Sequence, residues 1–135
     1  MIKLIIGKKG SGKTKKLLDM VNDAANTSLG NVVCIEKGDT LTYSVTNKAR
    51  LIDADEFGIC GYNEYYGMLA GIKASNNDIT HIFGDATLRI GSRNYDELAD
   101  FLVRINGISD IDFIFTISAD ETELPEKIFG LAEKI

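Results

Sequence analysis

The sequence is poor in the residues that build metal clusters and disulfide frameworks. His81 is the single histidine, which excludes a histidine metal cluster, and the two cysteines, Cys34 and Cys60, lack the spacing of a metal-binding pair. Cys34 lies in an apolar run and is expected to be a small core residue. So few cysteines predict a reduced, cytoplasmic setting.

Long apolar runs and prolines are also scarce. No apolar stretch approaches the length of a membrane span, and the short run at 2–7 leads into a glycine-lysine loop unlike the end of a signal peptide. We therefore expect no membrane partner. Linkers, repeats and low-complexity segments are missing, and Pro125 is the only proline, so residues 1–135 are predicted to form a single domain.

Positive charge is confined mainly to one end of the chain. The net charge is −5, yet the first sixteen residues contain six lysines and no acid, and the remainder has 9 basic and 20 acidic residues. An acidic body argues against a nucleic-acid partner, because phosphate backbones are bound by extended basic surfaces. The focused positive end predicts a small anionic ligand.

Apolar strand-like runs alternate with helix-like periodicity along most of the chain. This pattern predicts an α/β fold, a three-layer sandwich with a mainly parallel sheet of four to five strands and helices on both faces. Residues 41–45 and 49–54 are expected to form a short hairpin or an addition to the sheet edge. Strands are expected at 2–7, 31–36, 79–85 and 111–119, and helices at 14–25, 63–74, 94–105 and 123–135.

The segment GKKGSGKT connects the first strand to the first helix. It satisfies the pattern G-x-x-x-x-G-K-[ST] at every required position, and its residues are Gly7, Lys8, Lys9, Gly10, Ser11, Gly12, Lys13 and Thr14. Glycines let backbone amides curl around an anion, and the helix N-terminus adds partial positive charge. Lys13 is expected to contact the β- and γ-phosphates, and the Thr14 hydroxyl to bind Mg²⁺.

With this segment in this context, the chain resembles a P-loop NTPase, and the resemblance implies the P-loop NTPase fold. It also implies a small stand-alone protein whose cofactors are ATP and Mg²⁺. The family places an aspartate at the end of a later apolar strand to hold magnesium, and ITHIFGDA supplies Asp85 for this role. Asp53, Asp55 and Glu56 are alternative candidates on a segment whose place in the fold the sequence leaves open.

The predicted strand 111–119 indicates which division of the P-loop NTPases the chain resembles. In the additional-strand division, which includes recombinase-like and secretion ATPases, this strand inserts beside the phosphate-loop strand, and a polar residue at its tip senses the γ-phosphate. Thr116 and Ser118 are suited to that place, although such residues also bond locally in strands.

The group that activates water is harder to assign from the sequence. Family members commonly have a glutamate directly after the strand aspartate, whereas Asp85 is followed by Ala86. Some recombinase-like members carry it at the end of the second strand, where this chain has Glu36. We therefore predict catalytic roles for Lys13, Asp85 and Glu36, with slow turnover, and a protein partner or second copy that supplies an arginine. Arg89 and Arg93 are alternative phosphate contacts, in the same chain or in a neighbour.

The sequence is consistent with three candidate functions. The first is an ATPase that hydrolyses the β–γ phosphoanhydride. The second is a nucleoside kinase-like phosphotransferase, whose acceptor pocket would be lined by segment 53–75 with Tyr62, Tyr65 and Tyr66. The third is a nucleotide-binding switch with little catalysis.

Overall fold

Six parallel strands form the middle layer of the protein, in the order β3-β2-β4-β5-β1-β6. The computed structural model describes residues 1–135. The strands are β1 (Ile2–Gly7), β2 (Asn31–Glu36), β3 (Arg50–Asp53), β4 (Ile79–Gly84), β5 (Asp112–Ser118) and β6 (Glu133–Lys134). The helices are α1 (Lys13–Thr27), α2 (Tyr62–Ser75), α3 (Thr87–Ile90), α4 (Tyr95–Asn106), the 3₁₀ turn η1 (Glu121–Glu123) and α5 (Glu126–Leu131). The predicted α/β sandwich with a parallel sheet is confirmed, although the sheet has six strands and not the four to five expected.

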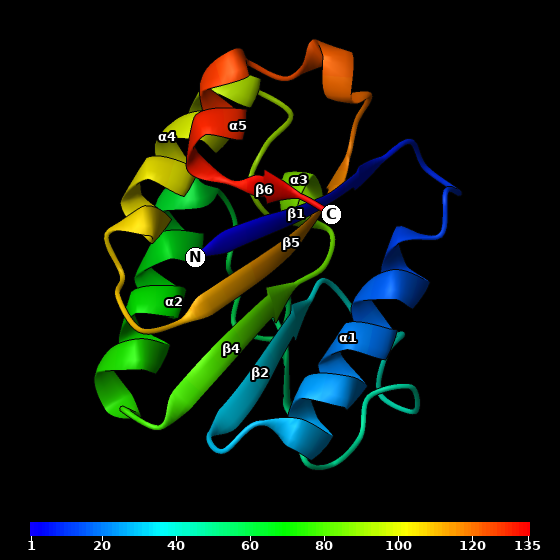
Figure 1. The fold of residues 1–135 in the computed structure, drawn as a ribbon, viewed down its shortest axis with the longest axis vertical. Coiled ribbons are helices and arrows are strands. Elements are labelled where there is room, and N and C mark those ends of the chain that lie inside the picture. The colour runs from blue at the N-terminus through cyan, green and yellow to red at the C-terminus, as the bar shows by residue number, and fades with distance from the viewer.

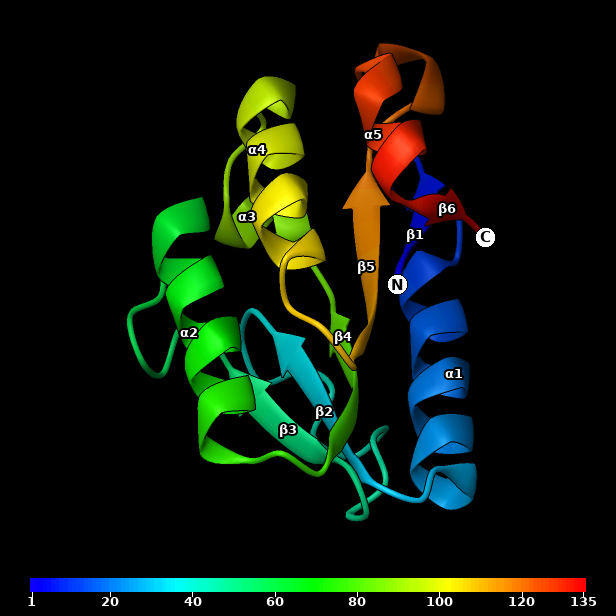
Figure 2. The same ribbon diagram turned by 60° about the vertical axis from the view of Figure 1, so that its left-hand side comes forward.

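Helices cover both faces of the sheet, as Figures 1 and 2 show. Helix α1 lies on one face, where Leu17 and Val21 pack with Ile5, Cys34 and other strand residues in the smaller of two apolar clusters. Helices α2 and α4 lie on the opposite face and share in the larger cluster. Parallel strands buried on both faces explain why the strand segments read as nearly continuous apolar runs.

Cys34 is fully buried and Cys60 is exposed, and neither forms a disulfide. The expectation that Cys34 is a core residue is confirmed. Burial raises the pKa of its thiol to about 12. No helix has the length and apolar character needed to cross a membrane.

The region between β2 and α2 differs in part from the prediction. Residues 41–45 form turns, so the predicted hairpin is wrong, whereas Arg50–Asp53 does form an edge strand. That strand runs parallel to β2, with Val33 opposite Arg50 and Glu36 opposite Asp53. A parallel neighbour requires a crossover, and residues 37–49 supply it by returning along α1, where the Asn22 side chain bonds the backbone of Ser44.

The chain from residue 123 to 135 is also not the single helix that its pattern predicts. Helix α5 is short, and Ala132 then adopts an extended conformation that leads into β6. Strand β6 pairs with β1 at the sheet edge, and the amide of Ile135 donates to the carbonyl of Leu4 at 2.9 Å. The exposed backbone of β1 needs hydrogen-bond partners, and this tertiary demand overrides the local helical pattern.

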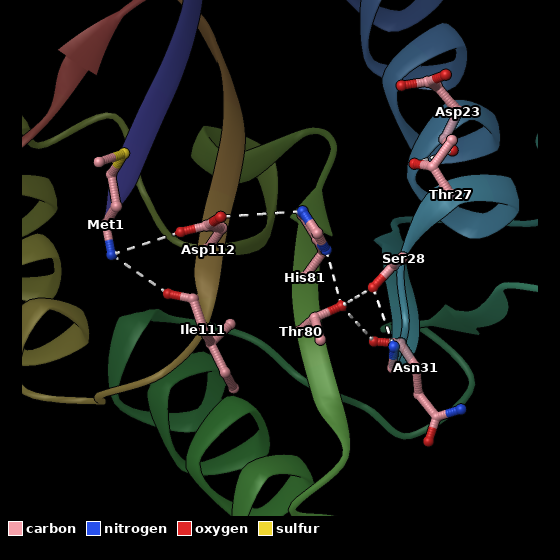
Figure 3. A network of polar contacts seen from close by, with 10 residues as sticks. Met1, Asp23, Thr27, Ser28, Asn31, Thr80, His81, Ile111 and Asp112 are labelled. Carbon is pink, nitrogen blue, oxygen red and sulfur yellow. Dashed lines mark hydrogen bonds and ion pairs between the residues drawn. The ribbon is translucent and has the colours of Figure 1, made fainter.

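A polar network joins the N-terminal starts of the central strands (Figure 3). The ring of His81 contacts the Thr80 hydroxyl at 2.8 Å and lies 3.9 Å from the carboxylate of Asp112. Thr80 also shares a 2.6 Å hydrogen bond with Ser28, which lies just after α1. These contacts connect β4 to β5 and to the α1–β2 turn. They lie at the N-terminal ends of the strands, away from the phosphate loop.

Candidate functional site

The loop between β1 and α1 is shaped by three glycines. Gly10 and Gly12 both have a φ of +85°, in the left-handed region that favours glycine. At Gly7, a Cβ would lie 2.4 Å from the Ser11 hydroxyl oxygen, so a side chain there would push Ser11 out of place. The turn closes through a 3.1 Å hydrogen bond from the amide of Ser11 to the carbonyl of Lys8. The sequence therefore folds locally into the curved loop that its glycine spacing predicts.

Lys13 is the first residue of α1 and its side chain lies under the loop. Only 9% of the residue is exposed, and its Nζ donates to the carbonyl of Lys8 at 3.0 Å. Burial lowers the pKa of Lys13 from its usual value, and the charge of Asp85 offsets part of this effect. Lys13 takes part in none of the ion pairs of the structure. Its ammonium group is thus held within the loop without a carboxylate partner.

Asp85 follows β4 and receives hydrogen bonds from two other elements. The Thr14 hydroxyl, on the first turn of α1, lies 3.2 Å from Oδ2, and the Thr116 hydroxyl, on β5, lies 2.7 Å from Oδ1. Thr116 is almost completely buried and also accepts a 3.1 Å hydrogen bond from the amide of Ala86. The carboxylate and the Thr14 hydroxyl therefore meet at the mouth of the loop, where both are oxygen ligands of the type that Mg²⁺ prefers.

The alternative acidic residues lie elsewhere. Oδ1 of Asp53 accepts from the amides of Gly38 and Asp55, at 2.8 and 2.9 Å, and Asp55 forms an ion pair with Lys37. Glu56 and Asp53 line a separate pocket beyond β2. Of the acidic residues that the sequence suggests for magnesium, the structure brings Asp85 to the phosphate loop.

Glu36 ends β2, as predicted, but it does not line the phosphate-loop cleft. It is 2% exposed, and its Oε1 accepts a 3.1 Å hydrogen bond from the amide of Leu41. It lines the separate pocket of about 360 Å³ under residues 39–49, together with Asp53. Burial raises the pKa of Glu36 above its usual value. Glu36 thus ends the strand next to that of Asp85, with Ile35 opposite Gly84, but it lines a different pocket from Lys13 and Asp85.

A cleft of about 730 Å³ opens between the phosphate loop and the segment that follows β4. Only two of its lining residues are hydrophobic, and Asp85 is its only carboxylate. The cleft is lined by Lys9, Gly10, Gly12, Lys13, Thr14, Lys15, Asp85, Ala86, Leu88, Arg89, Arg93 and Ser118. Its volume lies within the range of ordinary small-ligand sites.

The tip of β5 contributes to the cleft in two different ways. Strand β5 lies between β1 and β4, which is the arrangement expected of an additional strand. Ser118 lines the cleft directly, whereas Thr116 acts on it through Asp85 and Ala86. The sequence predicts that Thr116 and Ser118 lie at the strand tip. It does not reveal that the Thr116 hydroxyl is hydrogen-bonded to other groups of the protein.

The tyrosines of α2 mainly pack this helix against its neighbours. Tyr65 is fully buried and stacks on Phe101 with ring centroids 5.2 Å apart, and Arg104 lies over the ring of Tyr66 at 3.9 Å. The Tyr62 hydroxyl donates to the carbonyl of Ser92 at 2.7 Å, and Tyr62 lines a pocket separate from the phosphate-loop cleft. The three rings therefore do not form a common acceptor pocket beside the loop.

The parallel sheet, with its loop between β1 and α1, defines a P-loop-like α/β fold. A likeness of fold links the chain to the crystal structure of flagellar accessory protein FlaH from Methanocaldococcus jannaschii, with a TM-score of 0.57 and 17% identity. The match covers 96% of this chain but only 65% of the FlaH chain. No known protein-family model matches the sequence. No curated protein matches it either.

Proposed function

We propose that the chain binds Mg²⁺–ATP in the cleft beside residues 7–14 and slowly hydrolyses the β–γ phosphoanhydride. The observation that carries this proposal is the 3.2 Å contact between the Thr14 hydroxyl and the Asp85 carboxylate, in the same cleft as Lys13, whose ammonium group forms no ion pair. A phosphate-binding loop and a magnesium-binding pair of oxygens are thereby next to each other. The place of β5 between β1 and β4 supports membership of the additional-strand division of P-loop NTPases.

Each group has a definite task in this proposal. The loop amides and the N-terminus of α1 bind the phosphates, and Lys13 neutralises charge on the β- and γ-phosphates. Thr14 and Asp85 hold Mg²⁺, a cation that keeps several water ligands and needs few from the protein when a polyphosphate is bound. The donor set of one hydroxyl and one carboxylate fits that requirement.

Slow turnover follows from what the cleft contains. Hydrolysis requires a base within hydrogen-bond reach of the attacking water, and Ala86 occupies the position directly after Asp85. Asp85 is the only carboxylate that lines the cleft, and its place in the proposal is on the metal. The same observation favours a nucleotide-binding switch as the second candidate function, which would bind tightly without releasing phosphate.

Calorimetric titration with Mg²⁺–ATP tests the proposal. Lys13→Ala should weaken binding about tenfold to a hundredfold, because a charged hydrogen bond to phosphate is lost, while the fold is retained. Lys16→Ala is a matched control, since Lys16 is an exposed lysine of α1 outside the cleft. Equal affinity of the wild type and Lys13→Ala would overturn the proposal. A phosphate-release assay on the wild type then separates the slow ATPase from the switch.

A further inference from the structure

Two arginines form the wall of the cleft that faces the phosphate loop. Arg89 belongs to α3, and Arg93 lies in the connection from α3 to α4. Both line the same cleft as Lys13 and Asp85, within one chain. The roles given above to the loop, Lys13 and magnesium do not use them.

The backbone of helix α3 is anchored at both ends, which fixes the position of the Arg89 backbone. The other three residues of this helix, Thr87, Leu88 and Ile90, are buried, and Arg89 is exposed. The start of the helix is tied to β5 through the amide of Ala86, and its end accepts a 2.8 Å hydrogen bond from the amide of Gly61 at the carbonyl of Ile90. The backbone that carries Arg89 is therefore anchored before any ligand binds, which reduces the entropic cost of a contact.

Arg93 is directed toward the tip of β5. Its Nη1 lies 3.4 Å from the carbonyl oxygen of Ser118, which also lines the cleft. This contact is long and leaves the other donors of the guanidinium group available. A guanidinium group offers a planar set of donors that matches two phosphate oxygens at once.

The positive charge of this wall is not neutralised by the protein. Elsewhere around the loop, Lys8 pairs with Asp120 at 3.6 Å and Lys15 with Asp19 at 3.2 Å. Arg89, Arg93 and Lys9 form no ion pair. The cleft has five cationic side chains and a single carboxylate, and of the five only Lys15 forms an ion pair.

We propose that Arg89 and Arg93 form a second phosphate subsite, opposite the phosphate loop and supplied by the same chain. The subsite binds a phosphoryl group, which belongs either to the γ-position of the bound nucleotide or to a phosphomonoester of a second substrate. This inference rests on the proposed nucleotide binding. With this subsite in the same chain, neither a protein partner nor a second copy has to supply an arginine.

The test compares the wild type with the double variant Arg89→Gln/Arg93→Gln. Both side chains are exposed, so the fold should be kept. Arg50→Gln is the matched control, because Arg50 is an exposed arginine at the start of β3, outside the cleft and without an ion pair. Calorimetry measures the affinities for Mg²⁺–ATP and Mg²⁺–ADP, and then the binding of AMP and of inorganic phosphate to the ADP-loaded protein.

If the subsite holds the γ-phosphate, the double variant should lose about tenfold or more in ATP affinity with little change for ADP. If it holds a separate phosphomonoester, ATP and ADP should bind unchanged, and AMP or phosphate should bind to the ADP-loaded wild type and Arg50→Gln but not to the double variant. The double variant behaving as wild type in all four titrations would overturn the inference and leave nucleotide binding intact. A wild type that binds neither ATP nor ADP would overturn the proposed function and the inference with it.

Protein concentration separates a subsite within one chain from one shared between copies. If one chain supplies the whole subsite, the ratio of ATP to ADP affinity, or the AMP affinity of the ADP-loaded protein, is independent of protein concentration. A value that rises with protein concentration would overturn the assignment to the same chain.

Discussion

The hydroxyl of Thr116 donates a 2.7 Å hydrogen bond to Asp85 and accepts a 3.1 Å hydrogen bond from the amide of Ala86. One buried side chain of β5 thus fixes both the carboxylate that faces Thr14 and the start of the helix that carries Arg89. The adjacent Ala86 has a φ of +54°, which is unusual for a residue with a Cβ and is held in part by this hydrogen bond.

Thr116→Val should destabilise the fold by about 1 kcal/mol, because the half-buried amide of Ala86 loses its hydrogen-bond partner. It should also weaken Mg²⁺-dependent nucleotide binding, because Asp85 loses the group that orients it. Thr116→Ser keeps the hydroxyl and should stay close to wild type in both respects. Chemical denaturation and calorimetry measure the two effects, and a valine variant as stable as the serine variant would contradict the prediction.

Asp85→Asn keeps the shape of the side chain and removes its charge. The gain in ATP affinity that Mg²⁺ provides should fall by about tenfold or more, while metal-free nucleotide binding changes less. Titrations with and without Mg²⁺ measure this ratio. Asp55→Asn is the control, since Asp55 pairs with Lys37 away from the cleft. Should Asp55→Asn alter the ratio and Asp85→Asn leave it unchanged, the metal assignment would be wrong.

Glu36→Gln should flatten the pH dependence of stability. Burial raises the pKa of Glu36 in the folded protein, so the fold retains a proton that the unfolded chain has already released. The free energy of unfolding therefore decreases as pH rises from the ordinary pKa of glutamate through the raised one. Glutamine removes this decrease and should make the protein more stable than wild type above both pKa values.

Denaturation curves from about pH 4 to about pH 8 measure this difference between the variant and the wild type. Glu56→Gln, at an exposed glutamate of the same pocket, is the control. A slope with pH that is the same in wild type and Glu36→Gln would show that Glu36 does not cause it.

The same Glu36→Gln variant tests Glu36 as the base that orients water. This role requires the loop around Leu41 to release the carboxylate from its 3.1 Å hydrogen bond and turn it to the cleft. If the role is correct, ATP affinity is unchanged and phosphate release is lost. Unchanged phosphate release removes Glu36 from the mechanism of hydrolysis.

Tyr65→Phe should stabilise the protein by about 1 kcal/mol, because the buried Tyr65 hydroxyl has no hydrogen-bond partner. Tyr62→Phe is the contrasting control, since it removes the 2.7 Å hydrogen bond to Ser92 and should destabilise. At Gly84, a Cβ would lie 2.4 Å from the Tyr65 hydroxyl, so Gly84→Ala should cost less in the Tyr65→Phe background. Additive free energies of unfolding for the two changes would contradict this coupling.

Much of the fold and of the phosphate loop is predictable from local sequence. The strands Ile2–Gly7 and Asn31–Glu36 have the bounds that their apolar runs predict, because strands buried on both faces leave a continuous signal. The backbone conformation of the loop requires glycines, so the loop can be predicted from its own sequence. The position of Asp85 beside Thr14 follows from the meeting of strand ends at one edge of a parallel sheet.

The remaining features depend on tertiary contacts that leave no local pattern. Helix α3 has four residues, too few for a periodicity that would place Arg89. The orientation of Glu36 is set by the amide of Leu41, in a crossover that has no regular structure. Strand β6 exists because β1 needs a hydrogen-bonded neighbour, whereas its own residues favour a helix.

The order of the sheet has a consequence for synthesis on the ribosome. Strand β1 is translated first, yet both of its neighbours, β5 and β6, come last, and Ile2 pairs with Phe113. Contacts so distant in sequence form late, so the apolar β1 segment stays unpaired while most of the chain emerges. A nascent chain that stops before residue 112 carries the whole phosphate-loop sequence, but its β1 has no hydrogen-bonded neighbour to hold that loop in shape.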